Sequence, residues 1–126
     1  MAIFQCLFIF SHHIITSGSI PFLFKNLYYF KKELLPFEKQ KDNLKFHLTI
    51  ENASAIGDDR DNIYFFKDEK VRMITLTWNG ENEIGKGSTD QNFGLKPFGI
   101  EVIKEMEKLG MVIDVSHLSD AGLDSV

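Results

Sequence analysis

Three apolar runs of the sequence end in side chains that can bind a metal or donate hydrogen bonds. These groups are Glu51-Asn52, Trp78-Asn79 and Ser116-His117. Ligand sites in parallel α/β folds gather at the carboxyl ends of strands, so a carboxylate and an imidazole from different runs can converge on one divalent ion. Zinc accepts such ligands and, in catalytic sites, keeps one position open for a water that ionises near neutrality. Glu51 and His117 are therefore candidate ligands in a metal-dependent hydrolase.

Each of these residues also has a purely structural explanation. His117 could bond a neighbouring backbone carbonyl, while Ser119 or Asp120 caps the next helix. Glu51 could be a solvated turn residue, and Trp78 could be a packing residue. Spacing alone indicates an α/β domain with a candidate metal site, and it leaves these alternatives open.

The elements that must position these groups alternate between strand and helix. Apolar runs predict strands at 2–10, 44–50, 71–77 and 111–116. Helical character is found at 21–35, 59–70 and 97–109, and surface loops are expected at 39–43 and 85–93. Asp58 and Asp59 are candidate caps for the second helix. Pro97 suits the first position of the third helix, and Gly110 suits the left-handed residue that ends it. Such alternation is typical of parallel βαβ units.

The two faces of the predicted strands favour a barrel over an open sheet. In "LKFHLTIE" one face carries Phe46, Leu48 and Ile50, and the other carries His47, Thr49 and Glu51. In "VRMITLTWN" Ile74, Leu76 and Trp78 alternate with Thr75, Thr77 and Asn79. An apolar face toward helices and a second face of small polar groups suits a barrel interior near its open end. An open doubly wound sheet more often buries apolar residues on both faces.

Length and charge limit the class of protein. The 126 residues suffice for one compact domain, and the net charge of −4 argues against nucleic acid as a partner. The single cysteine, Cys6, excludes an intramolecular disulfide and fits a reducing, cytoplasmic compartment. The segment "MAIFQCLFIF" lacks the basic flank of a signal peptide and is too short to span a bilayer, so we expect a buried strand and no membrane anchor.

Two long segments resemble a known enzyme family. They are "VRMITLTWNGENEIGKG" and "GLKPFGIEVIKEMEKLGMVIDVSHLSD", and "FHLTIENASAIG" matches a further family segment. Together they resemble the membrane dipeptidase (renal dipeptidase) family of zinc peptidases, especially its bacterial branch. The resemblance implies a (β/α)8 barrel that hydrolyses dipeptides through a two-zinc site. It makes a different metal hydrolase on the same barrel a weaker alternative.

The resemblance also implies roles for the residues at the strand ends. Glu51 would bridge both metal ions, and His117 in "DVSH" would bind one of them. Trp78 stands where mammalian enzymes have a histidine that stabilises the tetrahedral intermediate. Because Trp78 cannot accept a proton and offers one N–H donor, Asn79 is an alternative donor to the substrate.

By resemblance, residues 1–126 form a single partial barrel domain with roughly strands two to five of eight. The family's His-x-Asp pair, a later metal-binding histidine and the substrate-binding Arg and Asp have no counterpart in these residues. A complete barrel needs about 250 residues. We therefore expect a portion of a dipeptidase that is inactive alone. The alternative is a non-catalytic half-barrel that assembles with itself or with a partner supplying the missing half, since unpaired sheet edges invite pairing.

Overall fold

The computed structural model describes residues 3–10 and 44–126, with side chains from residue 47 onward. Its strands are β1 (Ile3–Phe10), β2 (Leu44–Glu51), β3 (Val71–Thr75) and β4 (Val112–Asp114). Its helices are the 3-10 helix η1 (Ala53–Ile56) and the α-helices α2 (Asn62–Asp68), α3 (Pro97–Lys108) and α4 (Asp120–Leu123). The helix predicted at 21–35 and the loop predicted at 39–43 lie outside the described residues.

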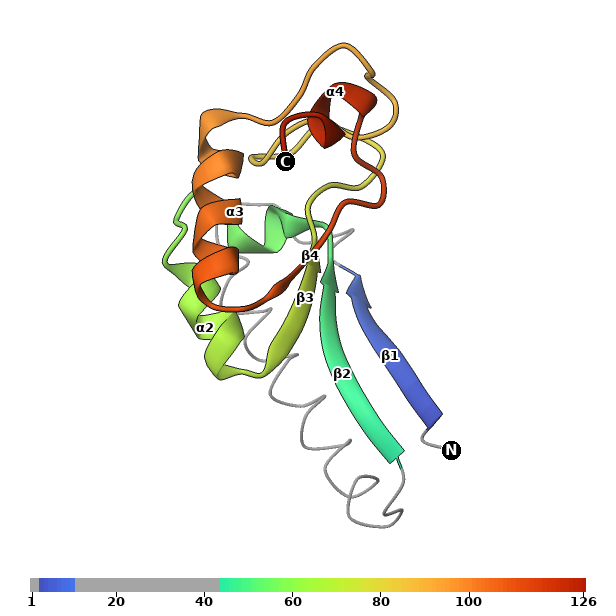
Figure 1. Ribbon diagram of the computed structural model, residues 1–126, viewed down its shortest axis with the longest axis vertical. Helices are drawn as coiled ribbons and strands as arrows, with labels where there is room; N and C mark the ends of the chain where they lie inside the picture. Colours follow the sequence, from blue (N-terminus) through green and yellow to red (C-terminus); the bar gives the residue numbers. More distant parts are fainter. Residues whose placement is uncertain (1–2, 11–43) are drawn as a thin grey trace.

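The four strands form one parallel sheet in the order β1-β2-β3-β4. Sequential strands are therefore neighbours, as the predicted βαβ units require. Thr49 lies beside Met73, and Thr75 lies beside Asp114. Because the strands are parallel, their carboxyl ends meet at one edge of the sheet, and Figure 1 shows α4 and the segment between β3 and α3 at that edge.

One face of the sheet holds the apolar core. Helices α2 and α3 lie on this face (Figure 1), and Ile50, Ile74, Val102 and Met106 are almost fully buried between helices and strands. On the opposite face Val112 of β4 is 57% exposed. The predicted alternation is thus seen as an apolar face under the helices and a second face that they leave uncovered.

Helix α3 begins where the sequence predicted and ends at Lys108, one residue before the predicted end. Pro97 is its first residue, and Gly110 beyond its end has a φ of 60°. Gly99 packs the helix closely against the chain after β3, because a Cβ atom built there would lie 2.1 Å from the carbonyl oxygen of Ile84. This contact joins the helix layer to the segment that leaves β3.

Several predicted boundaries are wrong. β3 ends at Thr75 instead of residue 77, and β4 covers only Val112–Asp114. α2 begins at Asn62 with Asp61 at its N-cap, because the Asp59 carboxylate accepts the backbone N–H of Asp61 and forms a turn before the helix.

Segment 85–93 is more than a surface loop. Gly85 and Gly87 are buried. Gly85 forms a β-bridge with Leu95, and Gly87 forms one with Leu118. The first bridge joins the segment to the chain before α3, and the second joins it to the chain that follows β4. No helix among the described residues is long and apolar enough to cross a membrane.

Candidate metal centre

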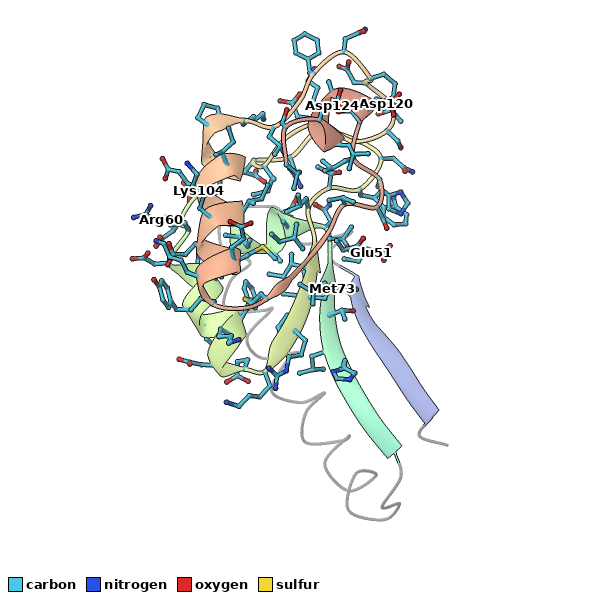
Figure 2. The ribbon with its side chains drawn as sticks, in the orientation of Figure 1. Glu51, Arg60, Met73, Lys104, Asp120 and Asp124 are labelled. Carbon is cyan, nitrogen blue, oxygen red and sulfur yellow. The ribbon has the colours of Figure 1, made fainter. Side chains whose placement is uncertain are left out.

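The four residues predicted for the site all lie at the carboxyl edge of the sheet. Glu51 is the last residue of β2 (Figure 2), where it is half-buried. Trp78 and Asn79 follow the end of β3, and His117 follows the end of β4. This is the edge at which ligand sites form in parallel α/β folds.

The structure brings Trp78, Asn79 and His117 into contact. The Nδ1 atom of His117 lies 3.2 Å from the Oδ1 atom of Asn79. The indole ring of Trp78 lies against the imidazole, with ring centroids 4.1 Å apart and planes tilted by 37°. The side chain of His117 therefore has one neighbour in the plane of its ring and another on its face.

The backbone of His117 is also held in an unusual conformation. Its φ is 66°, in the left-handed region that residues other than glycine seldom adopt. The hydroxyl of Thr77 donates to the carbonyl oxygen of His117 at 3.0 Å, and the N–H of Leu118 donates to the carbonyl of Val115 at 3.1 Å. These bonds stabilise the turn that presents His117. The structural alternative, a bond from the imidazole to a neighbouring backbone carbonyl, is not what the structure shows, since Nδ1 meets a side-chain amide.

Asn79 is itself fixed by the segment after it. The carbonyl oxygen of Asn79 accepts the N–H of Thr89 at 3.1 Å and the hydroxyl of Thr89 at 2.5 Å. The hydroxyl of Ser88 donates to Oδ1 of Asn79 at 3.4 Å. The backbone at Gly87 packs directly against that of Trp78: a Cβ atom on Gly87 would lie 1.9 Å from the carbonyl oxygen of Trp78. Only glycine fits this contact.

The end of β2 is tied to the same segment through a buried asparagine, Asn82. Asn52, directly after Glu51, has a φ of 76°, and its Oδ1 accepts the N–H of Ser54 at 3.1 Å. The amide nitrogen of Asn82 donates to that Oδ1 and to the carbonyl of Leu76, both at 2.8 Å.

The Oδ1 atom of Asn82 is equally engaged. It accepts the backbone N–H groups of Ile84 and Gly85, at 2.8 and 3.1 Å. Asn82 is thus a fully bonded buried amide that connects β2, β3 and the turn at 82–85. Sequence reasoning missed this residue. Its bonds to Ile84 and Gly85 are those of a local asparagine turn, which the sequence could have suggested, but its bond to Asn52 spans 30 residues and has no local signal.

Asp114 is a second polar group whose setting only the structure reveals. Its carboxylate accepts the Thr75 hydroxyl at 2.6 Å and the Ser116 N–H at 2.9 Å. Burial raises the pKa of the Asp114 carboxyl, but the hydrogen bonds from Ser116 and Thr75 outweigh burial and hold this pKa below its ordinary value. Asp114 is therefore an anion that links β3 to β4 beside the candidate site.

Ion pairs further order the segment after β3. The Nζ atom of Lys86 lies 2.7 Å from the carboxylate of Asp90 and 4.1 Å from the ring centroid of Phe93. Lys96 contacts Glu81 at 2.6 Å, and its hydrogen bond lowers the pKa of the Glu81 carboxyl. These contacts brace the segment that carries Asn79 and Asn82.

Comparison with known proteins identifies the family. A family model for membrane dipeptidases (peptidase family M19) matches residues 30–126, well over half of the chain. The chain belongs to this family. It is 31% identical over 84 residues to an uncharacterised dipeptidase of Schizosaccharomyces pombe, a match that covers 64% of the chain and 20% of that protein. It is 28% identical over 76 residues to a dipeptidase of Claviceps purpurea, covering 58% of the chain and 18% of that protein.

Solved structures of other proteins share the arrangement of the chain. A metallopeptidase of Rhodobacter sphaeroides, liganded with a phosphinate mimic of the dipeptide L-Ala-D-Ala, has a TM-score of 0.61 and 28% identity, covering 65% of the chain and 25% of that protein. An amidohydrolase of Pseudomonas aeruginosa has a TM-score of 0.81 with 18% identity, which shows a common fold, and covers 97% of the chain and 41% of that protein. The chain thus spans less than half the length of these proteins.

The described residues offer the right kinds of metal ligand but few of them. A carboxylate and an imidazole at one sheet edge suit a metallopeptidase ion. Among the side chains that the structure describes, no three His, Cys, Asp or Glu residues gather closely enough to hold a metal ion. The donor chemistry fits the metal cofactor that membership of the membrane dipeptidase family implies, while the described set alone is smaller than a zinc site requires.

Proposed function

We propose that this chain is a portion of a zinc-dependent dipeptidase, with Glu51 and His117 as two ligands of a binuclear site. The observation that carries the proposal is the placement of both residues at the carboxyl edge of a parallel sheet in a member of this family. In the complete enzyme the metal pair would supply an ionised water and polarise the scissile carbonyl.

We also propose that residues 1–126 form one partial (β/α)8 barrel domain, roughly strands two to five. Two features support this. The sheet order β1-β2-β3-β4 contains no reversal, whereas a doubly wound sheet reverses its strand order. The face carrying Val112 is left uncovered by α2 and α3, as the interior of an incomplete barrel would be.

The chain's own residues would act by binding and orienting. Glu51 would hold the metal through its carboxylate, and His117 would hold it through its imidazole. Trp78 and Asn79 would contact the dipeptide, because the indole N–H and the amide nitrogen of Asn79 are hydrogen-bond donors beside His117. The dipeptide mimic bound by the Rhodobacter sphaeroides relative makes a dipeptide the natural substrate to test.

The test compares this chain with the protein isolated from its native source. We expect chelator-sensitive dipeptide hydrolysis in native material with an intact mass at least twice 14.5 kDa, and little or no hydrolysis by the purified 126-residue chain. Two ligands are too few to hold two ions firmly. Zinc-dependent hydrolysis by the homogeneous chain would overturn the prediction of an inactive fragment, and native material without dipeptidase activity would overturn the assigned reaction.

A second candidate is a non-catalytic half-barrel that assembles. The observation that favours it is the sheet face that α2 and α3 leave uncovered, where Val112 of β4 is 57% exposed. Size-exclusion chromatography separates the two proposals. A monomer at low micromolar concentration contradicts self-assembly, whereas a stable dimer with no dipeptidase activity in native material supports it.

A further inference from the structure

We infer that Asn79 is a positioning residue for His117, whose amide oxygen accepts the Nδ1–H of the imidazole and leaves Nε2 as the metal-binding nitrogen. This inference rests on the proposed function, since it takes His117 as a metal ligand. It goes beyond that function by assigning which imidazole atom binds and what makes it do so.

The hydrogen bond defines the tautomer. Oδ1 of Asn79 lies 3.2 Å from Nδ1 of His117, and an amide oxygen can only accept. Nδ1 must then carry the proton. A neutral imidazole has a single N–H, so the free lone pair lies on Nε2, and it is the lone pair that binds a metal.

The position of Oδ1 is fixed by its own contacts. Thr89 holds the backbone carbonyl of Asn79 through two hydrogen bonds, and the Ser88 hydroxyl donates to the same Oδ1 atom that faces His117. The backbone that carries the acceptor is therefore held in place, and the Ser88 hydroxyl contacts the acceptor atom itself at 3.4 Å.

Trp78 and Asn79 restrict the imidazole in different ways. Stacking on Trp78 at 4.1 Å sets the plane of the ring, and it would persist if the ring turned over by a half-rotation. Only the bond to Asn79 distinguishes the two orientations, because a turned ring would place a carbon atom against Oδ1. Asn79 thus selects the orientation, and Trp78 stabilises the plane.

Hydrogen-bond acceptors of this kind affect how tightly a histidine binds a metal. A hydrogen bond to the second ring nitrogen fixes the tautomer and raises the basicity of a ligating histidine, and its loss lowers metal affinity by about 10- to 100-fold. Asn79 is exposed in this chain, so its substitution should act on the imidazole and leave the core intact.

The first experiment uses long-range 1H–15N spectra of the 15N-labelled 126-residue chain at a pH where the imidazole is neutral. The His117 signals are assigned by their loss in His117→Gln. We expect the Nδ1–H tautomer in the wild type, a shift toward Nε2–H in Asn79→Ala, and recovery in Asn79→Asp, because a carboxylate also accepts. Asn92→Ala, the same change at another exposed asparagine, serves as the matched control and should keep the wild-type tautomer.

An Nε2–H tautomer in the wild type would overturn the inference, as would an Asn79→Ala spectrum identical to the wild type. The wild-type spectrum is decisive by itself, so the assignment does not depend on every variant folding.

A zinc titration separates this inference from the proposed function. Asn79→Ala should lower zinc affinity about 10-fold, and Asn79→Asp should restore it. If zinc affinity falls in His117→Gln but not in Asn79→Ala, the positioning role is wrong and the proposed ligand stands. If zinc affinity is unchanged in His117→Gln, the proposed ligand is wrong, while the tautomer measurement still decides what Asn79 does.

Discussion

The two strand ends that carry the proposed ligands are built alike but held differently. Each contains a residue other than glycine with positive φ, Asn52 at 76° after β2 and His117 at 66° after β4. Each is bonded to an asparagine from the segment that follows β3. Because β3 lies between β2 and β4, one segment reaches both of its neighbours.

The difference lies in burial and in what each asparagine contacts. Asn82 is 7% exposed, and its side chain bonds to Asn52, the neighbour of Glu51, and to three backbone groups of the segment after β3. Asn79 is exposed and bonds directly to the proposed ligand. The β2 end therefore gains rigidity from a buried network, whereas the β4 end gains orientation from a single surface contact. Stability and ligand geometry should respond to different substitutions.

The largest loss of stability is expected at Gly87, where the segment after β3 folds back against the backbone of Trp78. In Gly87→Ala the new Cβ atom would meet the carbonyl oxygen of Trp78 at 1.9 Å, and backbone atoms cannot move aside cheaply. We expect the free energy of unfolding in urea to fall by about 3 kcal/mol. Gly80→Ala is the matched control, because a Cβ atom there meets nothing within 4 Å. Equal stability of the two variants would contradict the close contact.

In a second unfolding experiment, substitution of Asn82 should lower the free energy of unfolding more than substitution of Asn79. Asn82→Ala leaves the carbonyl of Leu76 and the N–H groups of Ile84 and Gly85 without their buried partner, which costs about 2 kcal/mol. Asn79→Ala removes an exposed contact and should cost less than about 1 kcal/mol. The comparison fails if Asn79→Ala destabilises the chain as much as Asn82→Ala.

A smaller, pH-dependent effect is expected at Asp114. Its carboxyl pKa is lowered in the folded chain, so its contribution to stability is present above the unfolded value of about 3.8. That contribution is lost as the pH falls from there through the lower folded pKa. The difference in urea midpoint between wild type and Asp114→Asn should therefore be larger at neutral pH than near pH 3. An equal difference at both would show that the charge of Asp114 contributes nothing.

Local signals in the sequence predict much of the frame. Pro97 and Gly110 set the limits of α3, and Ser119 caps α4 by accepting the Gly122 N–H at 2.9 Å, as one structural alternative foresaw. The parallel sheet follows from the alternation of strands and helices. The polar residues after β2 and β4 also lie at the predicted edge.

Contacts between distant segments are what local patterns miss. The apolar pattern continues past Thr75, where the strand ends; beyond it the N–H of Leu76 still donates to the carbonyl of Asp114, and the Thr77 hydroxyl donates to the carbonyl of His117. The pairing of Asn52 with Asn82 across 30 residues has no local signature. The polar composition of 85–93 suggests a surface loop, whereas its β-bridges to Leu95 and Leu118 depend on the folded chain.

The most direct test of the proposed metal centre is a zinc titration followed through the fluorescence of Trp78, the only tryptophan in the chain and a neighbour of His117. Because two ligands hold an ion only weakly, we predict a low-affinity, saturable change in the wild type that weakens further in both His117→Gln and Glu51→Gln. His47→Gln, a histidine of β2 outside the proposed site, should leave the titration unchanged. Titrations that are identical in the wild type and in both ligand variants would contradict the assignment of Glu51 and His117 as metal ligands.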